Sequence, residues 1–493
     1  MPFPSYPFIF LFLPLVLAVF FLLGSKGRID GAAIWLVLAS LFFYGSSDPV
    51  FPLMLIASVL VNYSLGMVIR KDFFALPRSA ALFAGILFNL SWLAGYKVYP
   101  MIGGVVPTGY VPNVDPYPVA VPLALSFFTI QQVAYLVDTY RGEVAGQTFL
   151  RYLLFVTFFP RLLAGPILRY REVGAQFADP QVYRFRSQNL SAGLTLFSMG
   201  LFKKVVFADV IGRFADSAFH AAALGAVLTM QEAWSGALSF TFQIYFDFSG
   251  YTDMALGIAW MFGILLPHNF DSPYKASSLV EFWRGWHRTL SRFVRDYLYI
   301  PLGGNRKGFF LQGAGLVFCF LLIGLWHGPA GTFILWALSH GVLTMLNHVW
   351  RTIRQSREHN PAPAPQWETW LGRVATFTVV TVLWVIFRSP DLPTAASILK
   401  SMAGLHPMPE AGFNNVKINE DRLYLFLAVC WFLPNSRQVM ANLFDPDRRG
   451  QGVEGWRWWE WRANEWWAGA AALFFIVSLL MLETVRPFIY FQF

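Results

Sequence analysis

Long apolar runs recur along this 493-residue chain and constrain its fold more than any other feature. A transmembrane helix needs about 20 mostly apolar residues to cross the hydrocarbon core of the bilayer. Helices suit this core because it offers the backbone groups no water. Runs that approach this length lie at 7–23, 32–45, 51–69, 79–96, 119–137, 190–208, 232–248, 251–266, 309–326, 330–349, 370–388, 421–434 and 468–485. Several of these runs are short, and some are expected to be re-entrant or tilted. We therefore expect an all-α integral membrane protein with about 11 transmembrane helices, plus re-entrant or interfacial helices.

The composition agrees with a membrane protein. Apolar residues make up 56% and charged residues 13%, whereas soluble domains carry roughly 25% charged residues. These proportions exclude a disordered chain, a fibrous repeat and an ordinary cytosolic enzyme. We expect one membrane domain over 1–493, with a motif-bearing core at about 120–350 and C-terminal helices at about 370–493. The net charge of +9 is assigned to cytoplasmic loops and lipid head groups, and nucleic acid is not an expected partner.

Basic residues follow alternate early runs, which predicts an orientation. They are Lys26 and Arg28, then Arg70, Lys71 and Arg78, then Arg141 and Arg151. The intervening stretches 46–50 and 100–118 contain no Lys or Arg. The positive-inside rule then places Met1 outside and the basic loops in the cytoplasm. Because no basic residue precedes the first apolar run, we expect a retained span rather than a cleaved signal peptide.

Three segments do not read as simple spans. Residues 150–186 mix apolar residues with six arginines and include Pro160 and Pro166, which predicts a broken or re-entrant element. Residues 354–368 are charged and then rich in Pro and Ala, which is typical of an exposed loop. Residues 456–467 carry six tryptophans between charges, as in an interfacial aromatic belt.

Residues 279–298 combine several arginines with a histidine in an amphipathic helical pattern. On a single helix, four arginines fall on one face and an apolar stripe that contains a histidine falls on another. The basic residues are Arg284, Arg288, Arg292 and Arg295, and the apolar stripe is Trp283, His287, Leu290, Val294 and Leu298. Two interpretations are open. The arginines bind lipid phosphates in an interfacial helix, or they face an anionic donor while His287 points into a buried cavity.

Polar residues also interrupt the neighbouring apolar regions. Asp247 and Asp253 are costly within a membrane, so they are either paired for structure or mark a path or site. His327 ends an apolar run before Gly328 and Pro329, where a helix stops. A lone apolar histidine is more often a core residue than a catalyst. Desolvation keeps an imidazole neutral, however, and the neutral form can accept a proton from a hydroxyl.

No metal site is expected. His340 and His348 are eight residues apart and do not share a helix face well. The chain also lacks a phosphate-binding loop, a dinucleotide fingerprint and the GxSxG motif of a serine nucleophile. Cys319 and Cys430 lie in apolar runs and read as small buried hydrophobes.

Together these motifs resemble the membrane-bound O-acyltransferases, and most of all their bacterial alginate O-acetyltransferase branch. The resemblance rests on FDFSGYTDMALG (246–257), NFDSPY (269–274), EFWRGWHRTLS (281–291), RDYLYIPLGGNRKG (295–308) and GLWHG (324–328). Supporting motifs are LFFYGSSDP (41–49), SFFTIQQVAYLVDTYRGE (126–143), FFPRLLAGPILRYRE (158–172) and FIYFQF (488–493). The motifs occur in the family's order over nearly the whole chain.

The resemblance implies a ring of helices around a tunnel that joins the two membrane faces. It implies His327 as the family's catalytic histidine, acting as base, and His287 as the second position of the catalytic pair, acting as an orienting or polarising donor. Tunnel or substrate-binding candidates are Trp326, Trp283, Asn269, Asp247, Tyr251 and Asp253, and candidates for donor phosphates are Arg284 and Arg288. Lipid contact is the favoured alternative for these arginines.

The same resemblance implies an acetyltransferase of the bacterial inner membrane, with membrane lipids around it and no bound cofactor or metal. Acetyl-CoA would be the cytoplasmic donor, a periplasmic partner of the SGNH-hydrolase type would receive the acetyl group, and an exported polysaccharide would be the final acceptor. His268 precedes Asn269, at a position where alginate-type relatives carry an acidic residue. The resemblance therefore does not identify the acceptor polymer, which could be alginate, cellulose, peptidoglycan or another glycan. Two alternatives are a D-alanyl transferase for teichoic acids and a polysaccharide transporter without chemistry.

Overall fold

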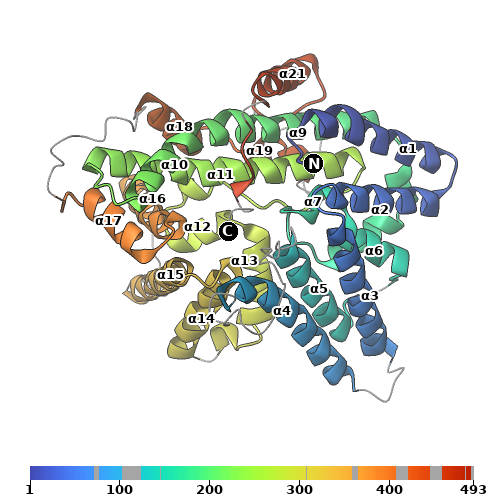
Figure 1. Cartoon of the computed structure of the whole chain (residues 1–493), viewed down its shortest axis with the longest axis horizontal. Coiled ribbons are helices and arrows are strands. Elements are labelled where there is room, and N and C mark those ends of the chain that lie inside the picture. The colour runs from blue at the N-terminus through green and yellow to red at the C-terminus, as the bar shows by residue number, and fades with distance from the viewer. Residues whose placement is uncertain are drawn as a thin grey trace, which may run out of the picture. The chain divides into compact units, whose positions relative to one another are not determined.

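The described part of the chain is built from helices. The computed structural model describes residues 1–71, 77–102, 124–144, 146–306, 308–357, 365–406, 420–444, 458–482 and 485–489. Every extended regular element within these ranges is a helix (Figure 1), which confirms the all-α prediction. The start of the 119–137 run, the middle of the predicted loop at 354–368, the start of the Trp-rich stretch at 456–467 and the end of the FIYFQF motif lie outside the described residues. The loop prediction is wrong at 354–357 and 366–368, which are helical.

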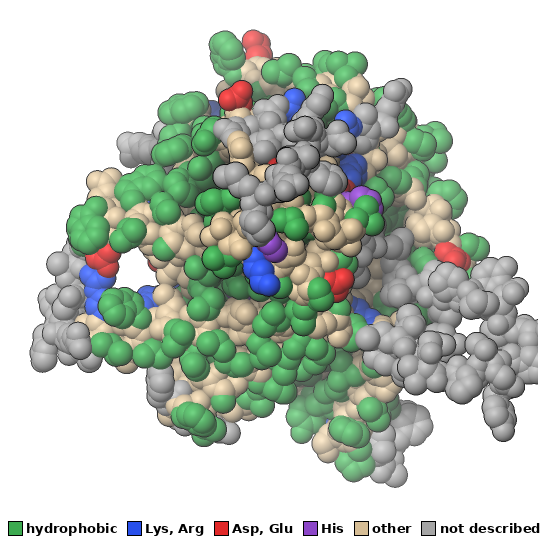
Figure 2. All heavy atoms as spheres, turned by 60° about the vertical axis from the view of Figure 1, so that its left-hand side comes forward, with side chains coloured by type: hydrophobic (Ala, Val, Ile, Leu, Met, Phe, Trp, Pro, Cys, Tyr) green, Lys and Arg blue, Asp and Glu red, His purple; other side chains and the backbone are tan. Residues whose placement is uncertain are grey.

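Several helices suit a membrane. Those long and apolar enough to cross one within the described ranges are Pro7–Ser25, Val50–Arg70, Arg78–Lys97, Phe310–His327 and Gln366–Arg388. Ile29–Gly45 and Glu465–Leu480 are shorter apolar helices. Large apolar side chains such as Phe83 and Leu53 are more than half exposed, and hydrophobic side chains cover much of the face in Figure 2. Such exposure is unfavourable in water but suits a lipid solvent. The predicted count of about 11 spans stays a prediction.

The chain divides into two compact units. The first unit comprises Met1–Met199, Tyr251–Pro267 and Ala463–Phe474. Its elements are η1 (Pro7–Phe12), α1 (Leu13–Ser25), α2 (Ile29–Gly45), α3 (Val50–Lys71), α4 (Arg78–Ile102), α5 (Leu125–Tyr140), α6 (Phe149–Thr157), α7 (Phe159–Leu162), α8 (Tyr170–Ala178) and η3 (Pro180–Tyr183), with most of α9 (Ser187–Phe202). Helices α3, α4 and α5 pack together (Figure 1). The predicted broken element at 150–186 is a series of short helices, α6, α7, α8 and η3.

The second unit comprises Gly200–Gly250, His268–Arg462 and Phe475–Phe493. Its elements are η4 (Lys203–Ala208), α10 (Asp209–Ala223), η5 (Pro273–Lys275), α12 (Leu279–Gly285), α13 (Arg288–Val294), η6 (Arg295–Tyr299), η7 (Gly304–Arg306), α14 (Phe309–His327), α15 (Gly331–Arg357), α16 (Gln366–Arg388), α17 (Leu392–Met402), α18 (Glu420–Phe432), α19 (Ser436–Val439) and α20 (Ala441–Phe444). Helices α11 (Met230–Met261) and α21 (Glu465–Leu480) contribute residues to each unit. Helix α15 packs against α12, α14 and α16.

The expectation of one continuous helix over 279–298 is wrong. Helix α12 begins after Ser278, whose side chain accepts a hydrogen bond from the Glu281 amide, and ends at Gly285. A Cβ on Gly285 would lie 2.8 Å from the Asp271 carbonyl oxygen, so the chain passes too close there for a larger residue. The chain then bends, and α13 begins at Arg288. The single-helix stripe of arginines therefore does not form.

Glycines allow close packing of α9 and α11 in the first unit. A Cβ built on Gly257 would lie 2.6 Å from the Gly193 carbonyl oxygen and 2.6 Å from the Phe197 amide nitrogen. Both neighbours are backbone atoms and cannot rotate away. Small residues allow such backbone approach where no hydrophobic force drives helix association.

We expect Gly257→Ala to destabilise the protein by about 1–3 kcal/mol, because the added methyl group forces α9 and α11 apart. Thermal unfolding in detergent, followed by size-exclusion chromatography, measures this loss. Gly469→Ala in α21 is the matched control, since its Cβ would meet nothing within 4 Å. An equal loss of stability in both variants would contradict this account of the helix contact.

Candidate active site

His287 occupies the bend between α12 and α13 in an unusual backbone conformation. Its φ and ψ are 40° and 53°, in the left-handed region that costs a non-glycine residue roughly 1–2 kcal/mol. The Arg288 amide donates a hydrogen bond of 2.9 Å to the Asn269 carbonyl oxygen, which fixes the bend against a neighbouring segment. Strain of this kind is often found at functional sites. Here the left-handed conformation interrupts the helix at His287, between α12 and α13.

Asn269 determines which nitrogen of His287 carries the proton. The Asn269 Oδ1 atom accepts hydrogen bonds from the Thr289 backbone amide at 3.3 Å and from the Thr289 hydroxyl at 2.9 Å. Since a backbone amide can only donate, this atom is the amide oxygen. It lies 3.0 Å from His287 Nδ1, so Nδ1 carries the proton and donates it. In the neutral ring, Nε2 then holds a lone pair, and it has no hydrogen-bond partner among the described residues.

Burial keeps this imidazole neutral. His287 is 1% exposed, and it lies outside the helices that could cross a membrane. Loss of hydration lowers the pKa of His287 to about 3. Near pH 7 the ring is therefore uncharged, and its unprotonated nitrogen can accept a hydrogen bond.

His327 is the last residue of α14, where Gly328 and Pro329 end the helix as the sequence predicts. Aromatic rings surround its imidazole. The ring centroids of Trp326, Phe387 and Trp336 lie 4.8, 5.1 and 5.6 Å from that of His327. Trp326 also contacts His287, at 6.4 Å between centroids, and so links the two histidines.

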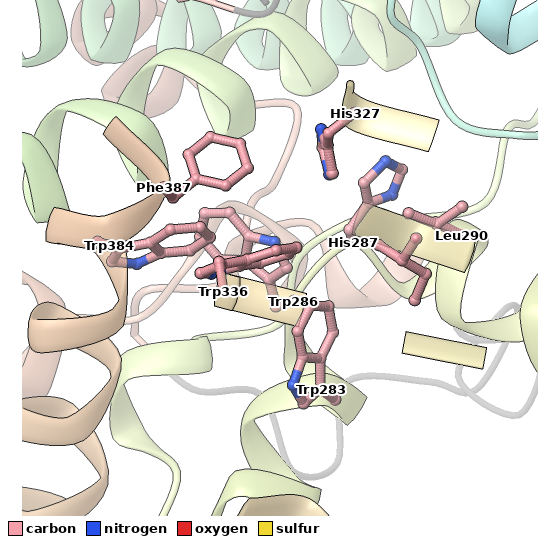
Figure 3. A pocket seen from close by; sticks show the side chains of 9 residues that line it. Trp283, Trp286, His287, Leu290, His327, Trp336, Trp384 and Phe387 are labelled. Atoms are coloured by element: carbon pink, nitrogen blue, oxygen red, sulfur yellow. The ribbon is translucent and has the colours of Figure 1, made fainter. Parts of the chain in front are cut away.

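Both histidines line one small cavity, here called the aromatic cavity (Figure 3). Its lining residues are Trp283, Trp286, His287, Leu290, Ile323, His327, Trp336, Trp384 and Phe387. They come from α12, the bend after it, α13, α14, α15 and α16. The cavity is small, with a volume of about 10 Å³. It therefore holds about one water molecule between indole, phenyl and imidazole rings.

The other predicted site residues of the second unit lie around this cavity in different ways. Trp283 lines it, while Asn269 lies behind His287 and is fully buried. Arg284 is exposed, and Arg288 pairs with Asp271 at 3.7 Å. Neither arginine lines the aromatic cavity. Arg437 also pairs with Asp271, so this carboxylate is shared by two guanidinium groups.

Asp247 belongs to a buried ion cluster rather than to the cavity lining. Lys204 Nζ lies 2.7 Å from Oδ1 of Asp209 and 2.7 Å from Oδ1 of Asp247. The amides of Arg486 and Ile489 donate to the two remaining carboxylate oxygens, at 3.2 and 2.7 Å respectively. The cluster therefore binds the C-terminal segment to α10 and α11. Of the two alternatives that the sequence offered for Asp247, the structure shows the first, pairing for structure.

Tyr251 and Asp253 lie in the first unit and are buried. The Tyr251 ring stacks on Phe3 at 5.0 Å between centroids. His268, directly before Asn269, is buried in the second unit. Burial first, and then the nearby cations Arg437, Arg288 and Lys203, lower its pKa to about 3. No group of three or more His, Cys, Asp and Glu side chains within the described ranges could hold a metal ion.

Most walls of the cavity were not predicted from the sequence. Ile323, Trp336, Trp384 and Phe387 were not singled out, because each lies within a run that reads as an ordinary apolar helix. Trp286 was not singled out either, because it lies outside the apolar stripe expected for 279–298. A weak signal was available. Trp384 and Phe387 are three residues apart in α16 and therefore share one face of that helix.

The fold and the cavity define the class: a helical membrane protein in which two buried histidines face one aromatic pocket. The sequence profile of the membrane-bound O-acyltransferase family, MBOAT, matches residues 82–386. The chain belongs to this family and is an O-acyltransferase.

Named relatives agree with this assignment. The chain is 38% identical to the peptidoglycan O-acetyltransferase of Helicobacter pylori, over 81% of this chain and 79% of the relative. It is 33% identical to the "Probable alginate O-acetylase AlgI" of Pseudomonas putida, over the full length of both chains. The teichoic acid D-alanyltransferase of Bacillus subtilis is 27% identical, over 56% of this chain and 71% of the relative.

We expect Asn269→Ala to lower O-acyl transfer by about 10- to 100-fold, because His287 loses the acceptor that fixes its orientation and tautomer. Thr289→Val should retain most of the activity, since it removes a neighbouring donor and leaves the contact between Asn269 and His287. Asn442→Ala is the matched control, as it loses only a bond to the Trp461 carbonyl oxygen. Transfer by equal amounts of folded protein is the measurement, and unchanged transfer by Asn269→Ala would reject the orienting role.

Lys204→Met should destabilise the protein by about 3–5 kcal/mol, because two buried carboxylates lose their shared cation. Thermal unfolding in detergent measures the effect. Lys400→Met is the control, since Lys400 is exposed on α17 and such surface changes stay within about 0.5 kcal/mol. If the two variants unfold alike, the ion cluster contributes little to stability.

Proposed function

We propose that this chain is an O-acetyltransferase that passes acetyl groups from acetyl-CoA in the cytoplasm toward an exported polysaccharide. The observation that carries the proposal is the pair of buried histidines on one narrow cavity, in a chain of the O-acyltransferase family. Relatives named for acetyl transfer to peptidoglycan or alginate support acetyl as the acyl group.

Acyl transfer from a thioester to a hydroxyl needs a base, stabilisation of the developing oxyanion and exclusion of water. His327 is the proposed base. It takes the proton of the attacking hydroxyl as the new C–O bond forms and the C–S bond breaks. That proton then passes to the leaving thiolate and gives a free thiol. No serine nucleophile is needed, because the hydroxyl of the acceptor attacks directly.

The tautomer of His287 determines its role in this reaction. The hydrogen bond to Asn269 leaves Nε2 as an acceptor in the neutral ring. His287 therefore first accepts a hydrogen bond from the hydroxyl or from the imidazolium that forms on His327. It becomes a donor, the role implied by the family resemblance, only after it has gained a proton. Both rings face a cavity that has room for about one water molecule, through which a proton could pass between them.

The remaining candidate residues have proposed roles of two kinds. Trp283 and Trp326 shape the cavity, and Asn269 orients His287. Asp247, Tyr251 and Asp253 are proposed to support the path of the substrate, with Asp247 acting through the ion cluster that it forms. Arg284 and Arg288 are proposed contacts for donor phosphates, and lipid phosphates are their alternative ligands.

The path of the acetyl group is also part of the proposal. Acetyl-CoA cannot cross a membrane, so a tunnel from the cytoplasmic side would deliver only its acetyl group. A partner of the SGNH-hydrolase type would receive it in the periplasm and modify the polymer. The chain would reside in the bacterial inner membrane with Met1 on the periplasmic side and its apolar helices in lipid.

Deletion of the gene and His327→Ala should both remove O-acetyl groups from one exported glycan, at matched membrane expression. The measurement is the O-acetyl content of each purified polymer, which also identifies the acceptor. If the deletion loses acetyl groups while His327→Ala keeps them, His327 is not the base, and a transporter without chemistry gains support.

D-alanyl transfer to teichoic acids is the second candidate, favoured by the similarity to the teichoic acid D-alanyltransferases. The same cells should then be assayed for D-alanine esters. Loss of D-alanine with unchanged O-acetyl content would replace the acetyl proposal.

A further inference from the structure

Four tryptophans wall the aromatic cavity, but one of them is held less firmly than the rest. Trp286, Trp336 and Trp384 are only 1–2% exposed and are packed among other rings. Trp283 is only partly buried, at the end of the cavity that α12 forms. A partly buried side chain loses fewer contacts when it rotates. Packing alone therefore fixes the Trp283 side chain less firmly than the other three tryptophans, and a specific interaction is needed to hold it in position.

That interaction comes from His340 on α15. The Trp283 indole nitrogen donates a hydrogen bond of 3.3 Å to His340 Nδ1. The two rings meet edge to face, with centroids 5.1 Å apart and an interplanar angle of 82°. An indole N–H can only donate, so Nδ1 is the acceptor and the neutral His340 ring carries its proton on Nε2.

His340 is itself fixed in place. It is fully buried, and the rings of Trp336 and Trp384 lie 5.1 and 6.4 Å away. Its substitution therefore removes an acceptor from a rigid position. His340 does not line the cavity, so it can act on the reaction only through its neighbours.

We propose that His340 is a positioning residue that sets the size limit of the transferred acyl group by holding Trp283 against the cavity. With Trp283 in place, the cavity has room for only about one water molecule, so it tolerates the smallest acyl group better than any longer one. Without the acceptor, the indole rotates toward its exposed side and the cavity lengthens. This inference rests on the proposed acyl transfer from a coenzyme A thioester.

The test compares acetyl-CoA with propionyl-CoA, using the purified full chain in proteoliposomes, a soluble oligosaccharide as the hydroxyl acceptor and release of the free thiol as the readout. One methylene in an apolar pocket is worth about 10- to 200-fold in discrimination. We expect His340→Phe, which keeps a ring but removes the acceptor, to reduce the preference for acetyl by about tenfold. His340→Asn keeps an acceptor at the position of Nδ1 and should keep the preference. A purely structural defect would lower both rates in parallel and leave their ratio unchanged.

Two further outcomes sharpen the test. Trp283→Phe should reduce the preference as much as His340→Phe does, and the double variant should add little, because the two changes remove one interaction. An unchanged ratio in His340→Phe, or a ratio in His340→Asn that falls equally, overturns the inference while acetyl transfer by the wild type still supports the proposed function.

A second measurement does not depend on acyl transfer. The indole ¹⁵N–¹H resonance of Trp283, assigned with Trp283→Phe, should shift and exchange faster with solvent in His340→Phe but not in His340→Asn. If that resonance is unchanged in His340→Phe, His340 does not hold Trp283, and the inference fails whichever donor the enzyme uses. If the wild type uses neither thioester, the proposed donor is wrong, and the resonance alone decides whether His340 positions Trp283.

Discussion

Polar groups buried in an apolar chain must find partners within the protein, because neither lipid nor aromatic side chains replace the hydrogen bonds of water. At the site, two hydrogen bonds meet this requirement. Asn269 satisfies one nitrogen of His287 and leaves the other facing the cavity. His340 in turn satisfies the indole of Trp283. The pairings outside the cavity thus determine which polar atoms remain inside it.

The hydrophobic pattern was sufficient to predict the helical membrane fold, since apolar runs of this length have few alternatives. The short motifs were sufficient to nominate His287 and His327, and the structure brings both to one cavity. Their chemical roles are still predictions. The resemblance supplied this part of the site, because the spacing of single histidines in apolar runs does not distinguish a catalyst from a core residue.

The sequence could not reveal the bend at His287. Residues 279–298 have a regular helical pattern, and local periodicity gave no reason to divide it. The break depends on contacts with residues 269–273, which lie earlier in the chain. The cavity walls were missed for a related reason. Trp336 and Trp384 come from α15 and α16, and only tertiary packing shows which face of each helix turns toward the histidines.

The ion cluster has a consequence for biogenesis. Lys204, Asp209 and Asp247 leave the ribosome more than 200 residues before the amides of Arg486 and Ile489 that bind the two carboxylates. During synthesis, Lys204 is available to both acids, but two carboxylate oxygens still lack their final donors. The second unit can therefore complete its buried polar network only after the chain has been synthesised beyond Ile489. A nascent chain that stalls or is cut before Arg486 would expose an unfinished polar centre to quality-control proteases of the membrane.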